Sequence, residues 1–109
     1  MVEGNMRPDV ERSLALHREV AERLRRDPRL LEHAKARVQR WFEDGSAHRS
    51  WATAWSEVLE GGLDEVVALL IDRGERAHDL RHVSPFAGVL DARTRWAILR
   101  RCSSWDFER

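Results

Sequence analysis

Hydrophobic residues recur at helical spacing from residue 8 to residue 102, and no segment shows the strict alternation that is typical of a strand. The first helix is predicted from about Pro8 to Arg26. Its apolar face is formed by Val10, Leu14, Ala21 and Leu24. His17 falls on the same face, and we expect a histidine at that position to be packed or partly exposed rather than to bind a metal.

Asp27 and Pro28 predict the start of a second helix, with the aspartate as N-cap and the proline at the first helical position. The inner face of this helix is predicted to consist of Leu31, Ala34, Val38, Trp41 and Phe42, and Gly45 is expected to end it. Because almost no loop separates the first two helices, they should form an antiparallel or steeply angled hairpin.

Turn residues divide the rest of the chain. Ser50 is expected to cap a third helix that ends at Gly61 and Gly62, and a fourth helix should run from Leu63 to near Gly74. One or two further turns are predicted over residues 75–83, and a last helix over about residues 92–102. The pattern therefore predicts an all-α protein, a single compact bundle of five or six short helices over residues 8–102. Residues 1–7 are expected to be a flexible N-terminus and residues 103–109 a C-terminal tail.

Composition narrows the class of protein. The 109 residues are enough for one domain, and the 19 basic and 19 acidic residues cancel, so no overall field favours nucleic acid or an anionic membrane. Lys35 is the one lysine among the 19 basic residues, an arginine bias that fits a GC-rich bacterial coding sequence. Cys102 is the single cysteine, and we find neither a long apolar run nor a leader-like segment. The simplest expectation is a cytoplasmic protein that does not bind membranes.

The stretch from Ser84 to Arg101 is the most informative part of the chain, because an apolar turn leads into a helix rich in arginine. Pro85 fixes its own φ, Gly88 permits a bend, and Asp91 can cap the following helix. Apolar residues bordered by arginines are typical of an interface core and its rim. We predict a partner-binding surface formed by Phe86, Val89, Arg93, Arg95, Trp96, Arg100 and Trp105.

Two alternatives to this interpretation stay open. Phe86 and Leu90 are the residues that would fill the bottom of the helical bundle if the turn only routes the chain. Trp105 lies with Phe107 in the short tail, where an exposed aromatic residue suits a binding hot spot but can equally fold back over the bundle.

The histidines invite a metal or catalytic interpretation. His78 and His82 are four residues apart, which places both rings on one side of a helix, as in a two-histidine metal clip. No third ligand is evident in the sequence, so we expect no metal and no cofactor. No catalytic residue is assigned.

The segment from Arg73 to His78 resembles the R-x4-H pattern of the all-helical HEPN ribonucleases. That resemblance implies RNA cleavage at a dimer cleft by Arg73 and His78, with the histidine as general acid and the arginine facing the phosphate. Gly74 departs from the pattern, since a polar residue usually follows the arginine in that family.

DNA binding is a further alternative. It depends on Arg93, Arg95, Arg100 and Arg101 in the last helix, to which Arg76 and Arg81 can add phosphate contacts. The zero net charge and the lack of a convincing helix-turn-helix spacing argue against it.

Two segments, residues 14–28 and residues 84–90 followed by Arg95 and Trp96, resemble small helical bacterial proteins of toxin–antitoxin or regulatory pairs. That resemblance implies a protein that masks or positions a partner. We therefore expect a non-enzymatic protein-binding module, the antitoxin or the adaptor or regulatory subunit of a bacterial protein pair. A protein partner is favoured over nucleic acid, and the sequence leaves a homodimer open.

Overall fold

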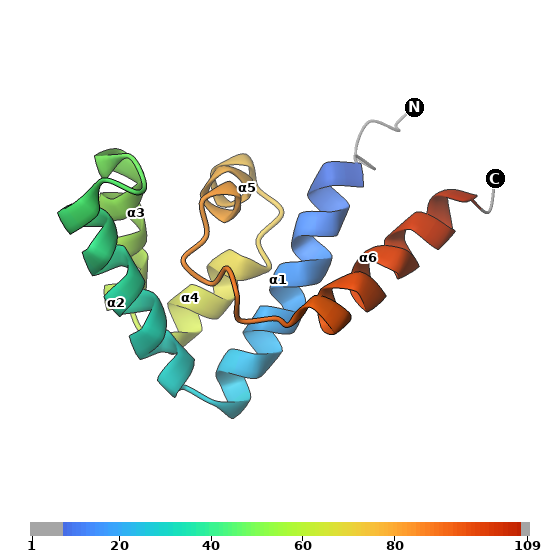
Figure 1. Ribbon diagram of the computed structural model, residues 1–109, viewed down its shortest axis with the longest axis horizontal. Coiled ribbons are helices and arrows are strands. Elements are labelled where there is room, and N and C mark those ends of the chain that lie inside the picture. Colours follow the sequence, from blue (N-terminus) through green and yellow to red (C-terminus); the bar gives the residue numbers. More distant parts are fainter. Residues whose placement is uncertain (1–7, 108–109) are drawn as a thin grey trace.

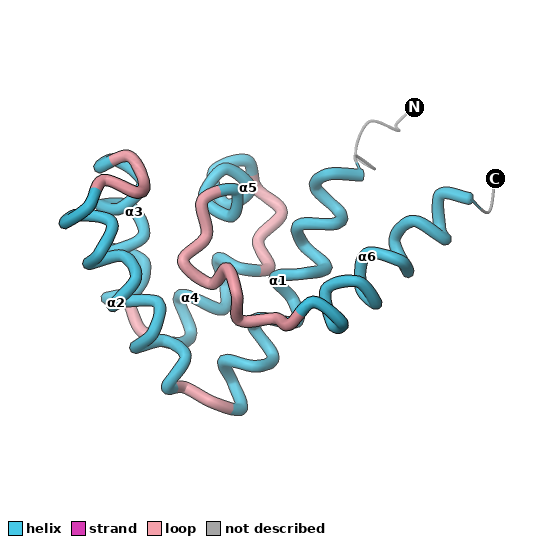
Figure 2. The backbone as a smooth tube through the Cα atoms, viewed as in Figure 1, coloured by secondary structure: helices cyan, strands magenta, loops and turns pink. Residues whose placement is uncertain are grey.

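The computed structural model describes residues 8–107, with side chains for residues 8–102. The predicted flexible segment 1–7 and residues 108–109 lie outside the described residues. The described part contains six helices and confirms the all-α prediction (Figure 1). They are α1 (Pro8–Arg26), α2 (Arg29–Asp44), α3 (Arg49–Glu60), α4 (Leu63–Leu70), α5 (Glu75–His82) and α6 (Ala92–Phe107). Figure 2 shows that short loops join most of them, while a longer linker precedes α6.

The helix boundaries follow local capping chemistry. Asp27 accepts the backbone N–H of Arg29 at 3.2 Å, as expected of an N-cap. Gly45 ends α2 in the left-handed conformation, with φ 73°, and donates its N–H to the Trp41 carbonyl. The cap of α3 differs from the prediction, because His48 takes that role and accepts the N–H of Ser50. Histidine is an uncommon N-cap, so sequence preference pointed to the neighbouring serine.

Two helix ends also differ from the prediction. The fourth helix ends at Leu70 rather than near Gly74, and the Arg81 side chain binds the carbonyls at its end, as described below. The last helix continues to Phe107, whereas its end was predicted near Cys102. Residues 103–107, expected in a tail, therefore belong to α6 in backbone conformation.

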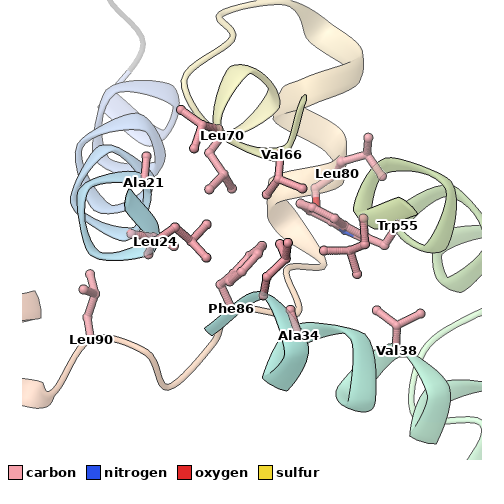
Figure 3. Packing of buried hydrophobic residues seen from close by; sticks show 14 of the residues in the cluster. Ala21, Leu24, Ala34, Val38, Trp55, Val66, Leu70, Leu80, Phe86 and Leu90 are labelled. Atoms are coloured by element: carbon pink, nitrogen blue, oxygen red, sulfur yellow. The ribbon is translucent and has the colours of Figure 1, made fainter. Parts of the chain in front are cut away.

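Helix α1 organises the bundle, since it packs against α2, α4, α5 and α6. Helices α1 and α2 diverge steeply from their short connection, and α3 returns along α2 (Figure 1). The space between these two arms is filled by side chains from α4, α5 and the linker. Figure 3 shows this core, which includes Leu24, Ala34, Val38, Trp55, Val66, Leu70, Leu80, Phe86 and Leu90.

The centre of the core fixes the linker that leads to α6. Trp55 is fully buried, and its Nε1 donates to the Leu80 carbonyl at 3.0 Å. The ring of Phe86 meets Trp55 edge to face, with 6.0 Å between ring centroids. Leu90, also in the linker, is buried beside α1 (Figure 3). Because Phe86 and Leu90 anchor the linker, the start of α6 has a defined position on the bundle.

Candidate functional site

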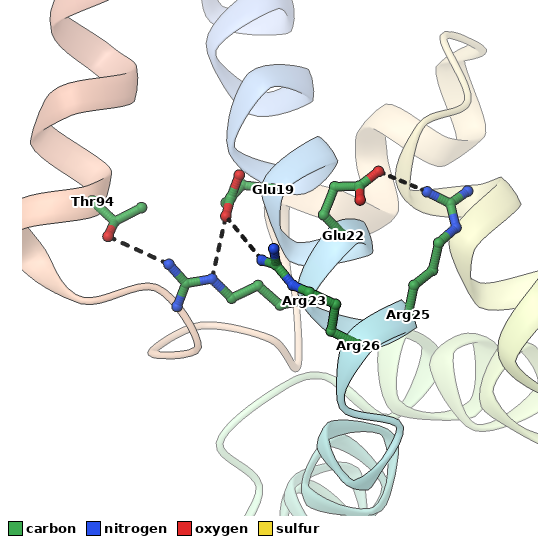
Figure 4. Close-up of polar contacts among 6 residues, drawn as sticks. All are labelled: Glu19, Glu22, Arg23, Arg25, Arg26 and Thr94. Carbon is green, nitrogen blue, oxygen red and sulfur yellow. Dashed lines mark hydrogen bonds and ion pairs between the residues drawn. The ribbon is translucent and has the colours of Figure 1, made fainter.

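Helix α6 packs on α1 and on no other described helix to a comparable extent. Asp91 caps it by accepting the Thr94 N–H at 2.8 Å, which confirms the predicted cap. Hydrogen bonding to the Thr94 side chain, and then to its backbone N–H, lowers the pKa of the Asp91 carboxyl. Arg23 of α1 reaches across to the Thr94 hydroxyl at 3.5 Å (Figure 4). Between Ala92 and Cys102, Ile98 is the one residue of α6 that is buried. The helix therefore leaves most of its surface open.

The outward face of α6 carries an aromatic side chain between two arginines. Arg93, Trp96 and Arg100 stand at positions i, i+3 and i+7, which places them in a row opposite Thr94 and Ile98. We call this row the α6 stripe. Trp96 is 65% exposed, the largest exposure among the bulky hydrophobic residues whose side chains are described. No acidic residue occurs between Ala92 and Cys102, so the stripe has no carboxylate on its own helix surface there.

The arginines of α1 behave differently. Arg23 and Arg26 both approach Glu19, at 3.3 and 3.8 Å, and Arg25 pairs with Glu22 at 2.9 Å (Figure 4). Such exposed pairs contribute little to stability, but they neutralise the helix surface. Neither Arg93 nor Arg100 makes an ion pair within the described residues. The positive charges of Arg93 and Arg100 are thus not paired by any described residue.

The other predicted interface residues lie elsewhere. Phe86 is 3% exposed and belongs to the core, so the folded chain does not present it to a partner, in line with the alternative that it fills the bundle. Val89 is partly buried against the same core. Arg95 lies on the opposite side of α6 from the stripe. Trp105 lies on α6, but its side chain is outside the described part.

A pocket of about 660 Å³ opens where α1, α2, the linker and the start of α6 meet. Its walls include four arginines, Arg12, Arg37, Arg81 and Arg95, and no aspartate or glutamate. We call it the arginine pocket. No sequence pattern predicts this pocket, because its arginines come from four separate segments and only the fold brings them together.

His17 forms part of the wall of this pocket. Its Nδ1 lies 2.8 Å from the Ser13 carbonyl, to which it must donate, and its Nε2 lies 3.2 Å from the Ser84 hydroxyl. The hydroxyl in turn accepts the Phe86 N–H at 3.1 Å, so the histidine ties the linker to α1. Burial lowers the pKa of His17 to about 4. The hydrogen bond to the Ser13 carbonyl acts in the opposite direction, whereas the positive charges of Arg81 and Arg95 lower the pKa further. The ring is therefore neutral at pH 7.

Arg81 is a buried cation, 3% exposed. Its guanidinium donates to the carbonyls of Leu69, Leu70 and Asp72, at 3.1, 3.4 and 2.7 Å. These carbonyls lie at or just beyond the end of α4, where the helix leaves acceptors unpaired and carries partial negative charge. Burial nevertheless lowers the pKa of Arg81. The helix end thus substitutes for the carboxylate that a buried arginine usually has.

The two residues of the ribonuclease-like pattern pair with different acidic residues of α1. Arg73 lies in the loop before α5 and forms an ion pair with Glu11 of α1. His78 is buried on α5, 3.8 Å from Asp9, and neither Arg73 nor His78 lines the arginine pocket. The structure does not bring these two side chains together into one described pocket.

His78 and His82 do lie together. Their rings meet edge to face with 4.5 Å between centroids, and the His82 Nδ1 lies 3.1 Å from the His78 carbonyl. Among the residues whose side chains are described, no group of three or more His, Cys, Asp or Glu is placed to hold a metal ion.

Comparison with known proteins adds no assignment: no family model, no curated protein and no solved structure matches the chain significantly. Across the described helices, none combines the length and the apolar character that a membrane span requires. The α6 stripe and the arginine pocket are the two features of the described residues that suit binding.

Proposed function

We propose that this chain is a non-enzymatic protein-binding module that recognises an acidic surface of a protein partner through the α6 stripe. The observation that supports it most directly is Trp96, an exposed tryptophan set between Arg93 and Arg100 on a helix with one buried residue between Ala92 and Cys102. Tryptophan and arginine are the residues most often found at the centres of protein interfaces. A carboxylate-rich partner would supply the charges that the stripe lacks.

The partner's expected chemistry follows from the stripe. The indole of Trp96 needs an apolar recess on the partner's surface. The guanidinium groups of Arg93 and Arg100, one helical turn away on either side, favour carboxylates at the rim of that recess. In biological terms we propose an antitoxin, adaptor or regulatory subunit of a bacterial protein pair, acting in the cytoplasm. This role rests on the exposed stripe and on the resemblance to such proteins, and not on any missing catalytic group.

The partner can be identified with a photo-crosslinking amino acid placed at position 96 of the full chain in its host, followed by mass spectrometry. The crosslinked protein is then purified, and its affinity is measured for the wild type and for Trp96→Ala. Removing an interface tryptophan of this kind should weaken binding by about 2 kcal/mol, roughly thirtyfold. Because Trp96 is exposed, the thermal midpoint of the free variant should stay near that of the wild type.

Charge reversal tests whether the arginines of the stripe bind acidic groups of the partner. Arg93→Glu and Arg100→Glu should slow association and reduce its salt dependence, because rim charges act mainly on the encounter rate. Arg40→Glu, at an exposed site on α2, is the matched control and should leave binding unchanged. The proposal fails if Trp96→Ala binds the crosslinked protein as tightly as the wild type. It also fails if the stripe captures only nucleic acid that is released by nuclease or high salt, or only a second copy of this chain.

A further inference from the structure

The arginine pocket brings together four arginines, and for three of them the described part of the chain supplies no ion-pair partner. Arg12 comes from α1, Arg37 from α2 and Arg95 from α6, and Arg81 of α5 forms part of the wall. Unlike Arg81, the first three make no hydrogen bond or ion pair with any described residue. By contrast, the arginines at the C-terminal end of α1 are mostly paired with glutamates.

Bringing like charges together costs free energy unless an opposite charge joins them. The effect is visible on His17, which lies in the same wall: Arg81 and Arg95 both act to keep its ring neutral. The fold nevertheless brings these arginines to one pocket, since the linker residues Phe86 and Leu90 lie in the core and position the start of α6 next to α1. A site with unpaired guanidinium groups suits an anion, because no internal ion pair has to be broken before it binds.

The size and the other walls of the pocket narrow the ligand class. A volume of about 660 Å³ falls within the range of small-molecule sites. Guanidinium groups bind phosphate oxygens in a bidentate manner, and the unpaired arginines of the wall can therefore hold phosphate groups. Trp41 and Leu16 give the pocket an apolar side on which a flat ring can lie.

We propose that the arginine pocket binds a nucleoside phosphate, with Arg12, Arg37 and Arg95 holding the phosphate groups and the side that includes Trp41 holding the base. This site is separate from the α6 stripe, because Arg95 faces the pocket while Arg93 and Arg100 face away from it. It is therefore independent of the proposed protein partner.

Titration calorimetry on the full chain, in chloride buffer without phosphate, tests the proposal with ATP, inorganic triphosphate and adenosine. ATP should bind, inorganic triphosphate should bind more weakly, and adenosine should bind least, because the arginines supply most of the affinity. Arg37→Gln and Arg95→Gln should each weaken ATP binding about tenfold, as expected for the loss of a charged hydrogen bond. Arg93→Gln is the matched control on the other face of α6 and should bind ATP like the wild type.

A second readout does not depend on affinity. A bound polyanion offsets the charges of Arg81 and Arg95, so the pKa of the His17 ring, followed by NMR, should rise on addition of ATP. Circular dichroism checks that each variant is folded, and Arg12→Gln provides an independent variant if one of the others is not. The proposal is overturned if ATP and triphosphate show no binding at millimolar concentration, if adenosine binds as well as ATP, or if Arg37→Gln and Arg93→Gln weaken binding equally.

Discussion

Acidification should destabilise this fold through His17, and the size of the effect can be worked out from its surroundings. The ring has a pKa of about 4 in the folded chain, against 6.5 for an unperturbed histidine, and burial is the main cause. The unfolded chain therefore binds a proton more readily than the folded one over this interval. The contribution of the neutral His17 ring to the free energy of unfolding is fully present above pH 6.5. It declines between pH 6.5 and pH 4 and is lost below pH 4.

One pKa unit corresponds to about 1.4 kcal/mol, so the limit of this effect is about 3 kcal/mol. At pH 5 the unfolded state is mostly protonated at this position and the folded state is not, which gives a loss of about 2 kcal/mol relative to pH 7.5. For a protein of this size, such a loss is a substantial part of the whole free energy of unfolding.

Urea unfolding at pH 7.5 and pH 5, in phosphate-free buffer of constant ionic strength, measures the loss. His17→Asn removes the titrating group, and its side-chain amide can still donate to the Ser13 carbonyl. Between pH 7.5 and pH 5, the free energy of unfolding should fall by about 2 kcal/mol more in the wild type than in His17→Asn. His33→Asn, at an exposed site on α2, controls for the removal of one histidine. Equal losses in the wild type and His17→Asn would refute the reasoning, because they would mean that the buried ring is not what resists protonation.

Three further changes test other parts of the fold. Arg81→Met keeps an unbranched apolar stem but removes the guanidinium and leaves the carbonyls at the end of α4 unpaired, so urea unfolding should show a loss of about 2 kcal/mol in the free energy of unfolding. An unchanged midpoint would show that these hydrogen bonds contribute nothing. Trp55→Phe removes the donor to the Leu80 carbonyl and part of the core volume, so the thermal midpoint should fall by several degrees, with Trp51→Phe, a partly buried neighbour, falling less. Gly45→Ala places a side chain at φ 73° with no atom within 4 Å of the new Cβ, so the loss of about 1 kcal/mol in unfolding free energy should be purely conformational, and Gly45→Asn should recover part of it.

Sequence periodicity predicted five or six helices, and the described residues contain six in the predicted order. Asp27, Gly45 and Asp91 were recognisable because each acts on its own neighbours within a few residues. Two of the errors have different origins. The cap of α3 is His48 in place of the neighbouring Ser50, an unusual local choice. The carbonyls at the end of α4 are bound by Arg81, which follows in sequence and reaches them only in the folded bundle.

The residues of the candidate site also differ in how far the sequence could predict them. Arg93, Trp96 and Arg100 could be grouped from the sequence, since helical spacing alone puts them on one face. Phe86 could not be assigned, because an apolar residue on a turn suits a core and an interface equally, and its contact with Trp55 decides for the core. The arginine pocket was missed altogether. No short-range pattern relates Arg12, Arg37 and Arg95, and an arginine with an acidic partner looks the same in sequence as one without.

The attachment of α6 to a single neighbouring helix has an evolutionary consequence. Substitutions at Arg93, Trp96 or Arg100 remove no core contact, so their effect on folding should be small while their effect on recognition is large. Partner specificity can then drift or be reselected without compensating changes in α1 to α5. Related chains that share this bundle should therefore differ most in the outward face of their last helix, and should vary least at Leu24, Trp55 and Phe86, where the linker is anchored.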